Sequence, residues 1–164
     1  MTVRLNGSTS GYVEIDAPAV AATSSFIFPT GTTDLSAGWI SYAPTAGGVS
    51  SIGNGSLTGA YMKIGRTVSF WAQLGVGSTT TFSGSIFLSL PFTANSQYAL
   101  QATLYTTAYG FWPIWCYASG NAAELFAVNT AGTYGALEAA NSTKPTTLAT
   151  NSRFYVSGTY ESVS

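Results

Sequence analysis

The chain has 164 residues, of which only 7% are charged, and it contains no histidine. Five basic and six acidic residues leave a net charge of −1, whereas roughly a quarter of the residues in ordinary soluble domains are charged. A basic stripe for binding phosphates is excluded, so no nucleic-acid partner is expected. Such a sparsely charged surface favours a component of an assembly over a protein that stays apart from its neighbours in solution.

The length predicts one domain, or one domain with an arm. A chain of this size buries on the order of 70% of its unfolded surface, so it needs no metal or disulfide to fold. Its single cysteine, Cys116, excludes an internal disulfide. Residues 1–6 lack the apolar core of a signal peptide, and no apolar run approaches the roughly 20 residues of a membrane span, so no membrane partner is expected.

Apolar and polar residues alternate along most of the chain, and this period of two predicts half-buried β-strands. Residues 122–128 are also interpreted as a strand, and residues 136–140 as a loop or a short strand. The alternation is clearest in residues 2–6, 12–16, 67–74, 86–90, 98–104 and 154–160.

Glycine and asparagine separate these runs and predict turns. Gly65-Arg66 lies between two strand patterns and predicts a tight two-residue hairpin. The regular spacing of strands and turns predicts an all-β fold, an antiparallel sandwich or barrel. The other turn signals are Gly47-Gly48, Gly53-Asn54-Gly55, Gly75-Val76-Gly77 and Gly120-Asn121.

The composition changes once, near residue 38. Residues 1–38 contain short strand patterns and are too few to enclose a core of their own. We therefore expect an N-terminal attachment arm that docks on its own domain, a sister subunit or another protein. Residues 39–164 are denser in strands and aromatic residues, and we expect them to form the β-sandwich domain.

Few residues offer catalytic chemistry, and no enzyme activity and no cofactor are expected. Without histidine there is no Ser-His or Cys-His nucleophile and no histidine metal site. Glu14 and Asp16 lie two residues apart on a predicted strand, about 7 Å from each other. That spacing suits an acid/base pair of a carbohydrate-active enzyme, but a solvated strand face is the favoured interpretation. Cys116 is expected to be a small core residue.

A cluster of aromatic residues is the most suggestive feature of the second half. Trp115 and Tyr117 share one strand face, opposite Ile114 and Cys116. The cluster fits three interpretations: core packing, a subunit interface, where Tyr and Trp are enriched, or stacking on sugar rings. Its members are Tyr105, Tyr109, Phe111, Trp112, Trp115 and Tyr117.

The first of two distinctive stretches runs from Leu5 through Gly7-Ser8-Thr9-Ser10-Gly11-Tyr12-Val13 and Ala17-Pro18-Ala19-Val20 to Phe26-Ile27-Phe28-Pro29. It resembles an N-terminal segment of tailed-bacteriophage virion proteins, where it introduces fibre, tail and decoration modules.

The second stretch is similar to a jelly-roll module of tail-fibre and head-associated proteins. It opens with Trp39-Ile40-Ser41-Tyr42-Ala43-Pro44-Thr45, continues with Tyr61-Met62-Lys63-Ile64-Gly65-Arg66-Thr67-Val68 and Leu90-Pro91, and closes with Ser157-Gly158-Thr159-Tyr160. The order of these motifs is more specific than any one of them. Residues 105–140 depart from the pattern, so partner-specific function is expected there.

The resemblance implies an antiparallel jelly-roll-like β-sandwich behind a short β-strand arm. It also implies a virion structural protein, usually a homotrimer, without catalytic residues. The protein would be made in the host bacterial cytoplasm and placed on the outer capsid surface. The chain has no long shaft, which favours a capsid decoration (cement) protein that binds the major capsid protein. The alternative is a tail-fibre or head-fibre module that recognises host-surface glycans.

In the cement interpretation, the arm pairs with the edges of capsid or sister subunits by β-augmentation. The side chains expected to attach it are Val3, Leu5, Tyr12, Val13, Ile15, Phe26 and Phe28. The side chains expected at a subunit interface or a glycan site are Tyr105, Tyr109, Trp112, Trp115 and Tyr117.

Overall fold

The computed structural model describes residues 3–6, 12–15, 38–129 and 135–163, the first two ranges by backbone alone. The chain divides into two compact units, Met1–Thr32 and Thr33–Ser164. In the first unit, β1 (Val3–Asn6) pairs antiparallel with β2 (Tyr12–Ile15). The strands predicted for these two segments are therefore confirmed.

The described part of the second unit consists of strands joined by turns and loops, and every strand pair is antiparallel. This confirms the prediction of an all-β, antiparallel fold. The strands are β3 (Ile40–Tyr42), β4 (Ala46–Ser51), β5 (Ser56–Ile64), β6 (Thr67–Gly75), β7 (Thr81–Ser89), β8 (Tyr98–Thr106), β9 (Gly110–Ser119), β10 (Ala122–Asn129), β11 (Ala136–Ala139) and β12 (Arg153–Glu161).

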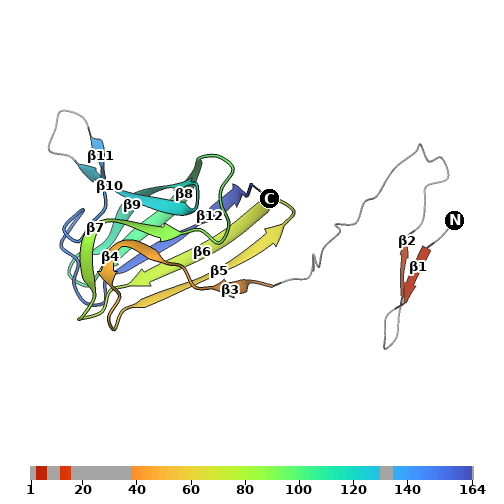
Figure 1. Ribbon diagram of the computed structural model, residues 1–164, viewed down its shortest axis with the longest axis horizontal. Coiled ribbons are helices and arrows are strands. Elements are labelled where there is room, and N and C mark those ends of the chain that lie inside the picture. Colours follow the sequence, from red (N-terminus) through yellow and green to blue (C-terminus); the bar gives the residue numbers. More distant parts are fainter. Residues whose placement is uncertain (1–2, 7–11, 16–37, 130–134, 164) are drawn as a thin grey trace. The chain divides into compact units, whose positions relative to one another are not determined.

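The ten strands form one sheet that curls on itself (Figure 1). Its order is β3-β5-β6-β12-β8-β9-β10-β7-β4, and β11 pairs with β10. The pairs β5–β6, β8–β9 and β9–β10 are hairpins of consecutive strands. The last strand, β12, enters between β6 and β8 and joins the two halves of the sheet.

The terminal strands of this order, β3 and β4, are consecutive in the chain and only residues 43–45 separate them. The link contacts Ser89 at the end of β7. The Ser89 N–H donates to the Thr45 carbonyl at 2.8 Å, and the Tyr42 hydroxyl of β3 donates to the Ser89 carbonyl at 3.3 Å. These bonds bring the two ends of the sheet together and explain why it curls.

Most of the predicted turns lie where the glycines indicated. β5 ends at Ile64 and β6 begins at Thr67, which confirms the hairpin at Gly65-Arg66. Gly120-Asn121 joins β9 to β10 in the same way. Residues 136–139 form the short strand that was one of the two interpretations of that segment.

The turn predicted at Gly47-Gly48 is wrong. Both glycines lie inside β4, where the pairing with β7 shifts register between Gly47 and Val49. Gly48 has a φ of +70°, and a Cβ there would lie 2.0 Å from the Ser85 carbonyl oxygen. The glycines therefore permit a β-bulge and a close approach to β7, two further uses of glycine in strands.

The core lies inside the curled sheet and follows the period of two. Leu74 of β6, Leu88 of β7, Leu104 of β8, Leu125 of β10 and Phe154 of β12 are all fully buried in one apolar cluster. Cys116 of β9 belongs to the same cluster, which confirms it as a core residue. Its burial raises the pKa of the thiol to about 12.

Candidate binding surface

The outer face of β6, β12, β8 and β9 carries large aromatic side chains. Strand alternation turns Phe154 and Ile114 into the core and their neighbours outward. Trp71 is 40% exposed, Trp115 61% and Phe111 71%. Monomeric proteins rarely expose large contiguous apolar patches, and such patches mark sites of interaction.

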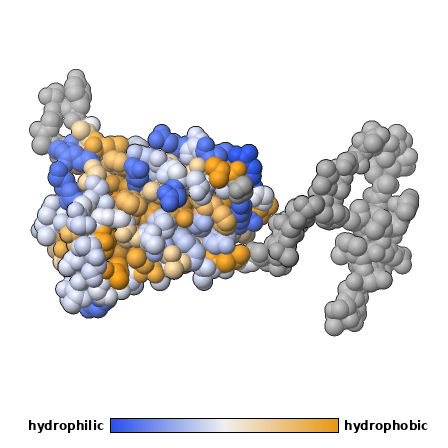
Figure 2. All heavy atoms as spheres, viewed as in Figure 1, coloured by the Kyte–Doolittle hydropathy of each residue, from blue (hydrophilic) through white to orange (hydrophobic). Residues whose placement is uncertain are grey.

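Cross-strand pairing places two tryptophans in one row across the sheet. Trp71 pairs with Ser157, Ser157 with Gln101, Gln101 with Trp115, and Trp115 with Phe126. Three strand spacings separate the two tryptophans, about 14 Å. We call these five residues the tryptophan row. None of the five is charged. Figure 2 shows hydrophobic and hydrophilic residues interspersed on the face of the domain that it presents.

The row continues into an aromatic stack on β9 and β10. The rings of Tyr117 and Phe126 are nearly parallel, 12° apart, with centroids at 5.2 Å. The Tyr117 hydroxyl donates to the Glu124 carboxylate at 2.9 Å, and this hydrogen bond raises the pKa of the phenol. The Glu124 carboxylate is therefore engaged by the Tyr117 side chain on the neighbouring strand.

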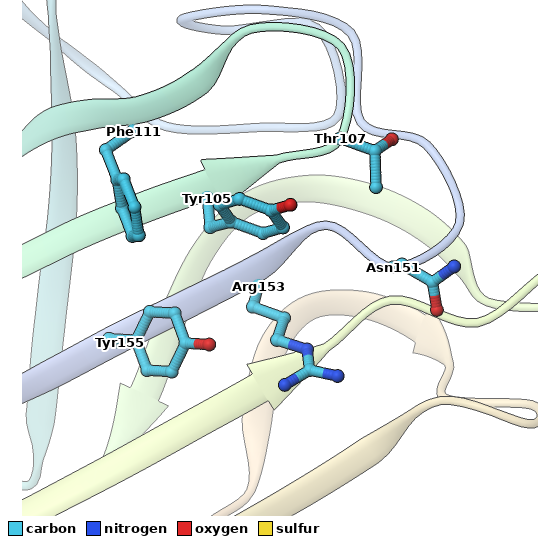
Figure 3. Close-up of a pocket in the computed structure, with 6 residues that line it drawn as sticks. All are labelled: Tyr105, Thr107, Phe111, Asn151, Arg153 and Tyr155. Carbon is cyan, nitrogen blue, oxygen red and sulfur yellow. The ribbon is translucent and has the colours of Figure 1, made fainter.

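An open pocket of about 440 Å³ lies farther along the same face. Phe111 and Trp115 are four residues apart on β9, so the pocket and the row are separated by about 13 Å. We call it the aromatic pocket (Figure 3). Its lining residues are Tyr105, Thr107, Phe111, Asn151, Arg153 and Tyr155.

Three strands bring the pocket residues together from distant parts of the chain. Arg153 of β12 pairs with Tyr105 of β8, and Tyr105 pairs with Phe111 of β9. The Tyr105 and Phe111 rings lie 5.2 Å apart at 54°. Tyr155 follows Arg153 on the same face of β12, with its hydroxyl toward the arginine (Figure 3). The pocket is thus built on paired strands, which hold side chains more firmly than loops do.

A fixed loop forms the rim of the pocket before β12. The Asn151 N–H donates to the Val76 carbonyl, and the Val76 N–H donates to the Ser152 carbonyl, both at 2.8 Å. The buried Ser152 hydroxyl accepts from the Ala149 N–H at 3.0 Å. Asn151 has a φ of +70°, a conformation that non-glycine residues adopt mainly at turns and functional sites. These bonds hold Asn151 at the rim.

Seven charged residues lie within 38–164, and Arg153 is distinguished among them. Its side chain has no ion pair and no hydrogen bond to any residue in the described ranges. The other six are engaged: Arg66 with Glu161 at 3.8 Å, Lys144 with Glu138, Glu124 with Tyr117, and Lys63 at 4.2 Å from the ring centroid of Phe92.

The structure separates the residues of the sequence-predicted aromatic cluster. Trp115 and Tyr117 share one strand face opposite Ile114 and Cys116, as predicted, and the structure shows that this face is the outer one. Tyr105 lines the aromatic pocket. Trp112 instead lies half-buried against the core, with its ring 6.2 Å from the exposed Tyr109 ring. Its buried Nε1 has no hydrogen-bond partner within the described part of the chain.

The expected attachment residues lie outside what the side-chain description covers. Five are in β1 and β2, where the backbone pairs Val3 with Ile15 and Leu5 with Val13. Phe26 and Phe28, like Asp16, fall outside the described residues. Tyr12, the fifth attachment residue in β1 and β2, pairs with Asn6.

Comparisons with protein-family models, with curated proteins and with solved structures find no match. Among the described residues, no three His, Cys, Asp or Glu side chains come together as a metal site would require. The same residues include no helix of the length and apolar character needed to cross a membrane.

Proposed function

We propose that this chain is a structural protein of a bacteriophage virion, and specifically a homotrimeric capsid decoration (cement) protein. It binds the outer shell and stabilises it by bridging capsomers. Its role is binding, with no catalysed reaction. The observation that carries the proposal is the tryptophan row, an uncharged row with two exposed tryptophans on a rigid sheet.

The tryptophan row has the composition of an interface centre. Such centres are depleted in charge and enriched in Trp and Tyr, and tryptophans supply a large share of the binding energy at measured hot spots. Trp71 and Trp115 are spaced widely enough to anchor one partner surface at two points. A specific interface buries about 1,600 Å² in total, an area that a sheet face of five strands offers.

The resemblance to phage virion modules supports the rest of the proposal. It suggests that the curled sheet is a jelly-roll-like sandwich and that the arm, residues 1–38, extends to the major capsid protein. The β1–β2 hairpin supports this part, because a short hairpin exposes backbone groups that another sheet edge can pair with. Attachment by apolar side chains and backbone pairing suits a chain with so few charges.

Gel densitometry of purified virus particles tests the proposal. A cement protein is present in a copy number close to that of the major capsid protein. Particles that lack the chain should also release their DNA at lower temperature than complete particles. A handful of copies per particle, or identical heat resistance with and without the chain, would refute the cement role.

The aromatic pocket favours a second candidate function, recognition of host-surface glycans by a tail-fibre or head-fibre module. Aromatic walls with a few polar groups are typical of ligand pockets. This candidate predicts few copies, a distal position on the particle and binding of the isolated protein to host cells. Immunogold labelling of intact particles distinguishes the two roles, since cement covers the head evenly.

A further inference from the structure

We propose that the aromatic pocket binds an acidic saccharide, with Arg153 holding the carboxylate of a hexuronate residue and the aromatic side chains contacting its ring. This deepens the second candidate function, glycan recognition, and rests on it. Four features of the pocket support this assignment: the aromatic walls, the unengaged arginine, the polar rim and the adjoining pocket.

The walls of the pocket suit the flat side of a sugar ring. Tyr105, Phe111 and Tyr155 surround an open space rather than stacking on the core (Figure 3). The apolar C–H face of a pyranose packs against such surfaces, while its hydroxyls remain at the edge, where polar groups are reached. The exposure of Phe111 is explained if a ligand covers it.

Arg153 supplies the charge selectivity. It is the charged residue of 38–164 that has no ion pair or hydrogen bond to the described residues, and no acidic side chain lines the pocket. A guanidinium donates two parallel hydrogen bonds to a carboxylate, a geometry that a neutral hydroxyl does not match. An anion on the ligand is therefore the natural partner for this side chain.

The rim adds groups for the ring hydroxyls. Asn151 provides an amide that donates and accepts, and Thr107 provides a hydroxyl. Neither side chain forms a hydrogen bond within the described part of the chain. The bonds of the 149–152 loop hold Asn151 in place before any ligand arrives, which lowers the cost of binding.

A second open pocket, of about 170 Å³, adjoins the first and shares Asn151 and Arg153 with it. It is lined further by Asn54, Ser56 and the backbone of three glycines, again without an acidic side chain. Arg153 thus stands between two open spaces. A chain of sugars, with an acidic residue at Arg153 and its neighbour in the second pocket, fits this arrangement better than a single monosaccharide.

Isothermal titration of the full-length protein with a matched pair of ligands tests the proposal. The probes are trigalacturonate and its methyl ester, which share one backbone and differ in charge. We expect the acid to bind at least about tenfold more tightly than the ester, the effect of a charge-assisted bidentate contact. Inorganic phosphate, as a competitor, should displace the acid only weakly, because it lacks a ring.

Two variants and a control locate the binding. Arg153→Gln should reduce affinity for the acid to that for the ester, and Phe111→Ala should weaken both ligands by about tenfold. Arg66→Gln removes an arginine that pairs with Glu161, at the other end of β12 from Arg153, and it should change neither affinity. Thermal unfolding of each variant confirms that it is folded.

The binding results separate acidic specificity from glycan recognition in general. Equal binding of acid and ester at the aromatic pocket would overturn the acidic specificity and leave glycan recognition standing. No binding of either probe at about 10 mM would overturn this proposal. The proposal would also be overturned if phosphate bound as tightly as trigalacturonate. The same holds if the Arg153→Gln variant bound the acid as tightly as the wild type does.

Discussion

The hydroxyl of Tyr160 forms two hydrogen bonds with the backbone of Phe92. It donates to the Phe92 carbonyl at 2.7 Å and accepts from the Phe92 N–H at 3.1 Å. Tyr160 is only 1% exposed, and its ring packs edge-on against Phe70 with centroids 5.6 Å apart. The Tyr160 hydroxyl of β12 thus satisfies both backbone polar groups of Phe92, which lies in the segment between β7 and β8.

Tyr160→Phe should lower the free energy of unfolding by about 1–3 kcal/mol, because the Phe92 N–H and carbonyl lose their partner in a buried setting. Urea denaturation measures the change. The control is Tyr155→Phe, since the exposed Tyr155 hydroxyl has no hydrogen bond within the described residues, and its effect should stay within about 0.5 kcal/mol. Equal effects of the two substitutions would contradict the assigned role.

Stability should fall at alkaline pH. Burial raises the pKa of Cys116 to about 12 from 9.0, that of Tyr160 to about 12 from 10.0, and that of Tyr42 in the same direction. Above pH 9 the unfolded chain therefore holds fewer protons than the folded chain, so unfolding becomes easier as pH rises. Each group adds a slope of at most about 1.4 kcal/mol per pH unit.

Cys116→Ala separates the thiol from the two phenols. The wild-type unfolding free energy should begin to fall near pH 9, whereas that of the variant should stay level until about pH 10, where tyrosine begins to titrate. Chemical denaturation at half-unit steps of pH measures both curves. Curves with the same onset would show that the thiol does not contribute.

The bulge in β4 predicts that two glycine-to-alanine substitutions differ strongly in how much they lower the free energy of unfolding. Gly48 and Gly110 have similar φ values, +70° and +76°, but a Cβ at Gly48 would meet the Ser85 backbone, whereas the space around Gly110 is open. Gly110→Ala should cost about 1–2 kcal/mol of backbone strain. Gly48→Ala should cost clearly more in the same thermal-unfolding series. Equal costs would mean that β4 moves away from β7 easily.

The tryptophan row should control association. Trp71→Arg and Trp115→Arg place a cation in the uncharged row, and each should shift the proposed trimer to monomer in analytical ultracentrifugation. Phe111→Arg, on the aromatic pocket, is the matched control and should leave the trimer intact. Association of the wild type should also change little with salt, because few charges are involved.

The strands were predictable because a curled sheet with one buried face keeps the period of two in each strand, as along β6, β8 and β12. Turn positions followed where glycine ends a strand, as at Gly65-Arg66. Gly47-Gly48 misled because a bulge and a turn can each place a glycine at positive φ, as Gly48 is here. The position of β12 between β6 and β8 was not predictable, since no local pattern specifies which distant strands pair.

The candidate site was predictable only in part, for the same reason. Alternation placed Trp115 and Tyr117 on one face, opposite Cys116, but the sequence offered no sign that Arg153 of β12 pairs with Tyr105 of the adjacent strand β8. Arg153 is a single charge in a polar stretch, and only its position opposite an aromatic residue gives it meaning. A signal was available in its rarity, because so few charges occur in this chain.

The ends of the sheet also bear on how copies of the protein meet at high concentration. One terminal strand, β3, has three residues, and the other, β4, is broken by a bulge. Long flat edges recruit further copies and start fibrils, whereas short and irregular edges resist this. The two ends of this sheet therefore offer little backbone template for pairing between copies, which protects the folded domain from edge-to-edge aggregation.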